Sequence, residues 1–424
     1  MSEKVVLDNG ATLLLEPVPS SEAVSIGLWI NLGSRDEKPH EHGCAHFTEH
    51  MLFKGTKNRS PFDIALEIDS LGGEINGVTG KENTYYYVNV AAEHYWKALD
   101  VLLDMFFNPL FNIRDFETEK GIILDEIILS MDDPEDFLNE LFSRTLWDNH
   151  PIALPVMGEK QDIENLSRET LLKFYQNHYT LEKLIISAAG NLQMKDFRVA
   201  TEELLLRHGH KSPASSVEAN RVKPSPCMKS SIEDRPVEQV YFMCGSEAFG
   251  YHDERRYAMI LLNMIVGSSF SSRLFQRIRE RMGLCYSISS GFSSFSDTGE
   301  FTISFSCNVS NLPFVIDAIR KELKLIIKGD ITGEELERAK DRFYGNYILS
   351  KESVEWKMVK MAAQQIIYGA PIPFSKTLEK IRSVTIDDIY ELAEAFFKGK
   401  SFSYASVGPP EQRKFLEGLS LSIE

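Results

Sequence analysis

The residues best suited to chemistry lie in the segment His46-Phe47-Thr48-Glu49-His50. His46 and His50 are four positions apart, so on a helix both imidazoles leave the same face and can reach one tetrahedral metal ion such as zinc. Glu49 lies beside them without being required as a ligand, which suits a base that takes a proton from an attacking water molecule. A helix whose two histidines only cap and pack is the simpler alternative. The metal interpretation therefore depends on the rest of the chain.

A zinc ion held by two histidines needs a third protein ligand, with one position left for water. The helix expected to begin near Arg114 offers Glu119 and Glu126, which are seven residues apart and therefore share one face. One carboxylate could bind the metal while the other orients a histidine. An exposed acidic edge is the alternative, because Asp125 shows that this helix has acidic residues to spare.

The chain reads as two related halves. A shift of 220 positions lays the apolar pattern of residues 98–107 over that of residues 318–327, and it pairs residues 128–130 with 348–350. A fixed offset held over two elements favours duplication over a chance likeness between amphipathic helices.

The second half lacks the residues that could hold a metal. At the same offset, His46, Glu49, His50 and Glu126 fall on Val266, Ser269, Phe270 and Asn346. We therefore expect one metal site, in the first half.

Apolar or alternating runs between long helical stretches predict strands at residues 24–30, 85–90, 184–189 and 301–305. This pattern predicts an α+β fold of two duplicated α/β sandwich domains, each a mainly antiparallel sheet with helices packed on one face. A stretch rich in Pro, Ser and Lys near the midpoint reads as a linker. The predicted division is a catalytic zinc-binding domain at 1–206, a linker at 207–236, and a homologous domain without a metal site at 237–424.

Composition limits the classes of protein. With 424 residues, 43% hydrophobic and 25% charged, the chain is typical of a globular protein of two or three domains. The N-terminus has no apolar core of a signal peptide, and no run approaches a membrane span, so we expect a cytoplasmic protein without membrane attachment. A net charge of -16 disfavours nucleic acid as a partner. The five cysteines are expected to be reduced, and Cys44 beside the site to be a small buried residue rather than an oxidisable thiol.

The motif HFTEHMLFKGT followed by EKGIILDE, with 126 − 50 = 76 positions from the second histidine to the last Glu, resembles the pitrilysin and insulinase family. The likeness is greatest to single-length members similar to the beta subunit of mitochondrial processing peptidase, and it covers nearly the whole chain. It implies that His46, His50 and Glu126 bind zinc, that Glu49 is the general base, and that Glu119 supports the site.

The segment LGGEINGVTGKENTYYYVNV resembles the substrate-binding strand of that family. Gly72 and Gly73 are expected to end a helix, and a strand, a Gly-Lys-Glu-Asn turn and a second strand follow. An edge strand can pair with an extended peptide, although an ordinary hairpin is the alternative. Asn76 and Gly77 match the family's Asn-Ala pair, which contacts the substrate main chain, and Gly77 in place of Ala should loosen the strand.

In the second half, RLFQRIRERMGLCYS reads as a helix ending at Gly283 and followed by a strand. Arg279 on the last helical turn and Tyr286 beyond the turn can point to one place, where a cation and a phenol would stabilise an oxyanion. A solvated basic helix is the alternative. The resemblance favours the catalytic interpretation, because the family has an Arg and a Tyr at the same spacing.

The resemblance implies a zinc-dependent metalloendopeptidase that hydrolyses peptides or unfolded polypeptides, basic presequence-like ones among them, inside an enclosed chamber. Larger relatives use four such domains and this chain has two, so we expect a homodimer in which Arg279 and Tyr286 serve the zinc of the opposite subunit. Two alternatives remain, a catalytically silent scaffold subunit and one half of a heterodimeric processing peptidase. A complete set of ligands and base in one chain argues against the scaffold.

Overall fold

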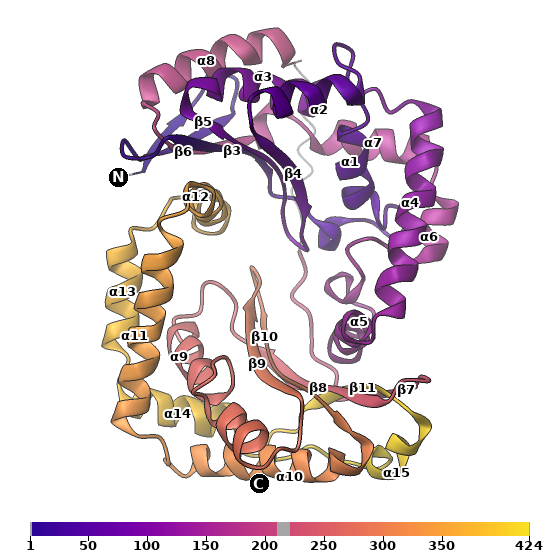
Figure 1. Cartoon of the computed structure of the whole chain (residues 1–424), viewed down its shortest axis with the longest axis vertical. Coiled ribbons are helices and arrows are strands. Elements are labelled where there is room, and N and C mark those ends of the chain that lie inside the picture. The colour runs from indigo at the N-terminus through magenta and orange to yellow at the C-terminus, as the bar shows by residue number, and fades with distance from the viewer. Residues whose placement is uncertain (1, 210–220, 424) are drawn as a thin grey trace. The chain divides into compact units, whose positions relative to one another are not determined.

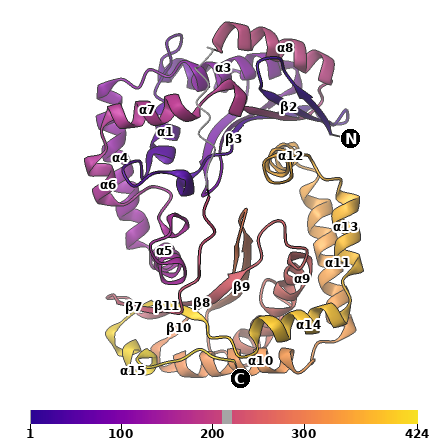
Figure 2. The ribbon, with the colours of Figure 1, turned by 180° about the vertical axis from the view of Figure 1, so that it is seen from behind.

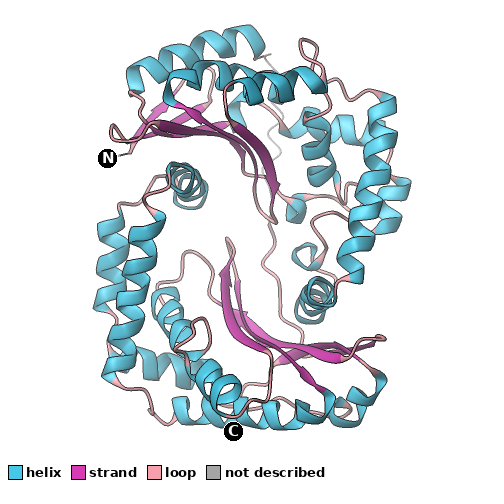
Figure 3. Ribbon diagram, viewed as in Figure 1, coloured by secondary structure: helices cyan, strands magenta, loops and turns pink. Residues whose placement is uncertain are grey.

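The computed structural model describes residues 2–209 and 221–423, and the chain divides into two compact units, each with its own sheet and its own apolar core. Figure 3 distinguishes the strands from the helices in each unit. Unit 1 comprises Met1–Ile128, Leu154–Arg221 and Ile348–Pro373, and unit 2 comprises Leu129–Ala153, Val222–Tyr347 and Phe374–Glu424.

Unit 1 is built on a six-stranded sheet with the order β1-β2-β6-β3-β5-β4, so β4 lies at an edge. Neighbouring strands run antiparallel, apart from β2 and β6, which run parallel. The strands are β1 (Glu3–Val6), β2 (Thr12–Pro17), β3 (Ala23–Ile30), β4 (Glu74–Thr79), β5 (Thr84–Ala91) and β6 (Ile185–Gly190).

Alternation along these strands sends side chains to two different faces. In β3, Val24, Ile26 and Leu28 enter the main core of unit 1, whereas Trp29 belongs to a separate cluster on the opposite face. Helices α3 and α8 cover the face of the main core (Figure 1). The α-helices that the first half of the chain contributes to unit 1 are α1 (Cys44–Leu52), α2 (Pro61–Ser70), α3 (Tyr95–Phe107), α4 (Ile113–Asp132), α6 (Lys160–Asn165), α7 (Arg168–His178) and α8 (Met194–His208).

One helix from late in the chain, α12 (Val354–Tyr368), packs on the opposite face of the unit 1 sheet, against β2, β3 and β6. Figure 2 shows it beneath that sheet from behind. The indole N–H of Trp29 lies 3.4 Å from the sulfur of Met358, and the Ser187 hydroxyl donates to the Met358 carbonyl at 2.9 Å. Both contacts are buried, so α12 is an integral part of unit 1.

Unit 2 repeats the design with a five-stranded sheet of order β7-β11-β8-β10-β9. Its early-chain helix α5 (Pro134–Trp147) packs against β8 and β11, where Leu138, Phe142 and Leu146 meet Met243 and Val407. The remaining elements are β7 (Ser230–Asp234), β8 (Gln239–Ala248), β9 (Ser287–Ser294), β10 (Gly299–Asn308), β11 (Ser403–Gly408), α9 (Arg256–Val266), α10 (Leu312–Ile327), α11 (Gly333–Ser350), α13 (Phe374–Ser383), α14 (Ile386–Phe397) and α15 (Arg413–Leu416).

The predicted fold class is confirmed. The four predicted strands correspond to β3, β5, β6 and β10, although the third was expected to begin at residue 184, one residue before β6. The duplication extends further than the sequence pattern indicated. Helices α4 and α5 begin at residues 113 and 134, and α11 and α12 begin 220 positions later, at residues 333 and 354. Helix α1 lies between β3 and β4 in chain order, and α9 takes the corresponding place between β8 and β9 in unit 2. The sequence of α9, RYAMILLNMIV, contains no His, Cys, Asp or Glu.

The compact units differ from the predicted domain bounds. Residues 129–153, placed in the first domain by the sequence, pack within unit 2, and residues 348–373, placed in the second, pack within unit 1. Each unit therefore covers the second face of its sheet with a helix from the other half of the chain. Of the predicted linker 207–236, residues 210–220 lie outside the described residues, and residues 230–234 form β7. Within the described part of the chain, no helix combines the length and apolar character needed to cross a lipid bilayer.

Candidate metal centre

Helix α1 carries the predicted metal-binding segment, and its start requires glycine. Gly43 precedes the helix with φ of +86°, and a Cβ there would lie 2.5 Å from the Ile163 side chain and 2.7 Å from the Met157 carbonyl oxygen. On the buried face of α1, Phe47 stacks on Phe116 of α4 with ring centres 4.8 Å apart. This contact sets α1 beside α4, the helix that carries the predicted third ligand.

The two helices bring His46, His50 and Glu126 together in unit 1. Ligand atoms of the three side chains all lie within 4.8 Å of one another, the one such group of His, Cys, Asp and Glu found among the residues that the structure describes. Glu126 Oε2 lies 3.9 Å from His46 Nε2 and 3.6 Å from His50 Nε2. Both imidazole side chains are largely shielded, with 15% and 17% exposed, whereas 39% of the Glu126 side chain is exposed.

The donor set fits zinc. Two imidazole nitrogens and one carboxylate oxygen form a common catalytic zinc set, and ligand atoms in a tetrahedral site lie about 3.4 Å apart. The separations of 3.9 Å and 3.6 Å between Glu126 Oε2 and the two imidazole nitrogens are close to this spacing. Burial, with the nearby His50 as a smaller cause, lowers the pKa of His46 to about 4, so its imidazole is neutral at pH 7, the form that binds metal.

Glu119 lies behind the cluster, as predicted for a residue that supports it. Its Oε2 is 3.0 Å from His50 Nδ1, and its Oε1 is 2.8 Å from the ammonium of Lys54. Only 3% of the Glu119 side chain is exposed. A carboxylate at Nδ1 holds the proton there and leaves Nε2 of His50 to face Glu126.

Glu49 directly precedes His50 on α1, and its side chain contacts β4. The Thr79 hydroxyl donates a short hydrogen bond to its carboxylate, and a Cβ on Gly77 would lie 2.7 Å from Glu49 Cγ. Burial raises the pKa of Glu49, the Thr79 hydrogen bond and His50 lower it, and Glu126 raises it. A partly desolvated carboxylate held in this way can accept and return a proton.

The predicted substrate strand is β4, and it occupies the sheet edge next to Glu49. Its partner in the sheet is β5, with Asn76 opposite Tyr87 and Gly77 opposite Tyr86. Asn76 is exposed, and its side-chain oxygen accepts the N–H of Gly77 at 2.8 Å. The structure therefore gathers seven of the nine predicted site residues in unit 1.

The other two, Arg279 and Tyr286, belong to unit 2. Arg279 lies in the π-helical segment η5 (Phe275–Arg281), with its guanidinium 4.6 Å from the centre of the Phe275 ring. Gly283, with φ of +61°, follows the segment, as predicted for its end. Tyr286 is 75% exposed just before β9, so its phenol is accessible to a ligand. Their catalytic role stays a prediction.

The sequence interpretation did not single out Thr79 or Lys54, although each had a signal. Thr79 is two positions from Gly77 on one strand and so shares its face, and Lys54 is four positions beyond His50. The five cysteines are free, and Cys44 is fully buried, as expected. Burial also raises the pKa of the Cys44 thiol.

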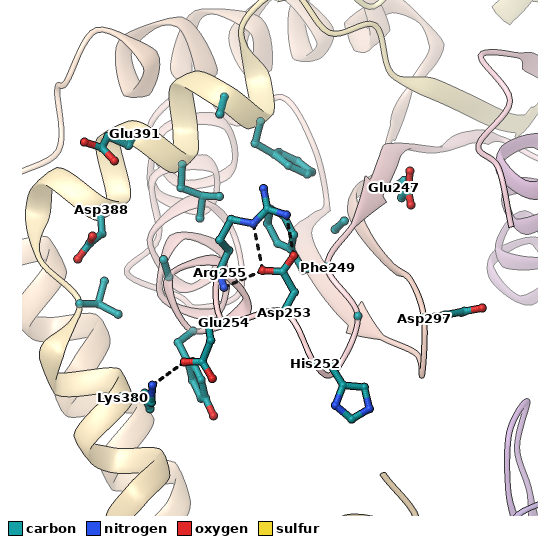
Figure 4. A pocket seen from close by; sticks show the side chains of 18 of the residues that line it. Glu247, Phe249, His252, Asp253, Glu254, Arg255, Asp297, Lys380, Asp388 and Glu391 are labelled. Atoms are coloured by element: carbon teal, nitrogen blue, oxygen red, sulfur yellow. Dashed lines mark hydrogen bonds and ion pairs between the residues drawn. The ribbon is translucent and has the colours of Figure 1, made fainter. Parts of the chain in front are cut away.

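Unit 2 contains a cavity with a volume of about 1020 Å³. Figure 4 shows two ion pairs among the side chains that line it, Arg255 with Asp253 and Lys380 with Glu254. Both closest separations are near hydrogen-bond length, at 2.6 Å and 2.7 Å. None of the predicted site residues lines it.

Comparison with known proteins gives matches over nearly the whole chain. Residues 12–160 match the family model described as Insulinase (Peptidase family M16), and residues 165–343 match the model described as Peptidase M16 inactive domain. The chain is 32% identical over 409 residues to the uncharacterized zinc protease YmxG of Bacillus subtilis, covering 96% of this chain and 98% of the relative. It is 34% identical over 415 residues to an uncharacterized zinc protease of Rickettsia felis, covering 96% and 98%.

Two solved structures share the fold. A protease from Helicobacter pylori superposes with a TM-score of 0.88 at 19% identity, and the match covers 96% of this chain and 100% of the protease. A peptidase M16 inactive domain from Pseudomonas fluorescens superposes with a TM-score of 0.84 at 20% identity, covering 96% and 98%.

Proposed function

Because the chain belongs to the insulinase family, peptidase family M16, we propose that it is a zinc-dependent endopeptidase that cleaves peptides and unfolded polypeptides. Zinc is the cofactor. The observation that carries the proposal is the convergence of His46, His50 and Glu126, from two helices, on one small volume beside Glu49. These three residues would hold the zinc ion.

Each residue of the proposed site then has a defined role. When bound, zinc supplies a Lewis acid that polarises the scissile carbonyl and makes water more acidic. Glu49 takes a proton from the attacking water and returns it to the leaving amine, for which its partial burial suits it. Glu119 holds His50 in the orientation that directs Nε2 to the cluster.

Strand β4 would bind the substrate as an added strand. Its position at the sheet edge leaves backbone N–H and C=O groups to pair with an extended peptide, and recognition of backbone tolerates many sequences. The same strand contacts Glu49 through Gly77 and Thr79, so a peptide paired with it lies next to the base. A folded protein has no such free extended segment, and for this reason unfolded substrates are favoured.

Zinc removal tests the proposal. Treatment of the purified chain with a chelator should abolish cleavage of an unstructured basic peptide, and one equivalent of zinc should restore it. Cleavage that continues after the metal has been removed to below detection would contradict a zinc-dependent reaction.

We further propose a homodimer in which Arg279 and Tyr286 stabilise the oxyanion at the opposite subunit's zinc site. In a mixture of Glu49→Gln and Tyr286→Phe chains, half of the sites in each mixed dimer would combine an intact Glu49 with an intact Tyr286. Activity should therefore return on mixing. If subunits exchange and activity does not return, the two residues do not act across the dimer.

The resemblance to paired processing peptidases also supports a second candidate, an enzyme that needs a different partner chain. Size-exclusion chromatography with mass measurement separates the two cases. A homodimer that cleaves peptide by itself supports the first candidate, whereas an inactive monomer that binds zinc supports the second.

A further inference from the structure

The short helix η1 (Ser34–Asp36) is fastened to the turn between β4 and β5. The N–H of Arg35 donates to the Lys81 carbonyl at 2.9 Å, and the Arg35 guanidinium pairs with Glu82 at 2.6 Å, with 1% and 9% of the two side chains exposed. A Cβ on Gly33 would lie 2.5 Å from the Glu82 backbone nitrogen, so only glycine permits this approach. The turn and η1 therefore behave as one piece.

Glu37 follows η1 directly and reaches the start of α1. Its Oε2 accepts the N–H of Gly43 at 2.9 Å, and its Oε1 accepts the N–H of Ala45 at 2.7 Å. Glu37 is only 6% exposed. Gly43 occupies the N-cap position and has no side chain to serve as a cap, so Glu37 supplies the cap from six residues upstream.

Helix α1 is thus tied to the β4–β5 hairpin at two places. Its start is tied through Glu37 and η1 to the turn, and its later part through Glu49 to Thr79 on β4. The hairpin carries the proposed substrate strand, and α1 carries His46 and His50. The third ligand, Glu126, comes from α4, so any slide of α1 along its axis moves two of the ligands relative to it.

We propose that Glu37 is a positioning residue that holds the metal-binding helix in register with the substrate strand. The proposal rests on the proposed zinc peptidase function. Loss of the cap would let α1 shift, which separates His46 and His50 from Glu126 and moves Glu49 relative to a peptide on β4. Metal affinity and kcat should fall together, whereas KM should change little, because β4 itself is intact.

Glu37→Gln tests the cap with a minimal change of shape. Each carboxylate oxygen accepts one N–H, and an amide has only one oxygen, so its NH₂ group must face either the Gly43 or the Ala45 N–H, donor against donor. Glu41→Gln is the matched control. Glu41 is also 6% exposed and lies in the same segment, but its carboxylate accepts the N–H of Lys38 at 3.1 Å and no N–H of α1.

Two readouts other than turnover separate positioning from general stability. The visible spectrum of the cobalt-loaded protein reports the geometry of the metal ligands, and competition with a chelator gives zinc affinity. For Glu37→Gln we expect an altered cobalt spectrum and zinc affinity weaker by about tenfold, the lower end of the effect of residues that orient metal ligands. Glu41→Gln should keep the wild-type spectrum and affinity even if its melting temperature falls.

Glu37→Asp keeps the carboxyl group and withdraws both oxygens by one methylene. It should therefore give a smaller change in the same direction, and it serves as the test if Glu37→Gln fails to fold. A wild-type spectrum and zinc affinity in the folded Glu37 variant would overturn the proposal, and so would equal changes in the Glu41 control. Failure of the wild-type protein to bind zinc or cleave peptide would instead contradict the proposed function. That outcome differs from a failure of the Glu37 proposal, in which the wild-type protein is active and only the variant results disagree.

Discussion

Replacement of Glu119 should weaken zinc binding in a graded way. Its carboxylate lies 3.0 Å from His50 Nδ1 and is only 3% exposed, so water cannot easily substitute for it. A hydrogen bond to a charged group contributes about 1.5–3 kcal/mol and one between neutral groups about 0.5–1.5 kcal/mol. Glu119→Gln therefore forfeits roughly 1–1.5 kcal/mol, a zinc Kd raised by about 5- to 15-fold, because about 1.4 kcal/mol corresponds to tenfold. Glu119→Ala removes the whole bond and should raise Kd by about 10- to 150-fold.

Competition with a fluorescent chelator measures these Kd values directly. Glu117→Gln is the matched control, because Glu117 lies on the same helix, carries the same charge and is exposed. It should bind zinc as wild type does. If Glu119→Gln also binds zinc with wild-type affinity, or if the Glu117 variant is weakened equally, then Glu119 does not support the site through His50.

Two further changes test other parts of the structure. Gly77→Val should lower kcat at least tenfold with zinc content unchanged, because even a Cβ at this position would lie 2.7 Å from Glu49 Cγ; wild-type kcat would show that Glu49 has room to move. The second concerns His208, whose pKa is raised to about 9 against burial by hydrogen bonds to Asp100 and Asp104. Because the pKa of His208 is higher in the folded protein than in the unfolded chain, the protonated side chain stabilises the fold fully below pH 6.5. This contribution, roughly 3 kcal/mol in the free energy of unfolding, is lost as pH rises through 9. The melting temperature of wild type should therefore fall more steeply between pH 6.5 and 9 than that of His208→Gln, and parallel curves would contradict this account.

Local pattern was enough to predict the elements that carry the metal centre. The i, i+4 spacing of His46 and His50 places them on one face of α1, and the seven-residue spacing of Glu119 and Glu126 places both on one face of α4. Period-two alternation likewise predicted the strands. These signals depend only on residues within about two helical turns of one another, so they can be recognised in a single sequence.

Contacts between distant segments left no such signal. Helix α12 packs on the sheet of unit 1 through Met358 and Trp29, which are 329 positions apart. Glu37 lies in the charged run SRDEK, and nothing in its spacing indicates that both of its oxygens are buried against the start of α1. A buried carboxylate is revealed only by the backbone N–H groups that it meets after folding.

The central claim is that Glu49 is the base of a zinc site. The most direct test compares purified wild-type protein with Glu49→Gln, with bound zinc quantified in both samples and cleavage of an unstructured basic peptide followed by mass spectrometry. The account predicts one zinc per chain in both proteins and cleavage by wild type alone, since the substitution leaves His46, His50 and Glu126 intact. Equal cleavage by the two proteins would contradict the role of Glu49, and wild-type protein that does not bind zinc would contradict the metal centre itself.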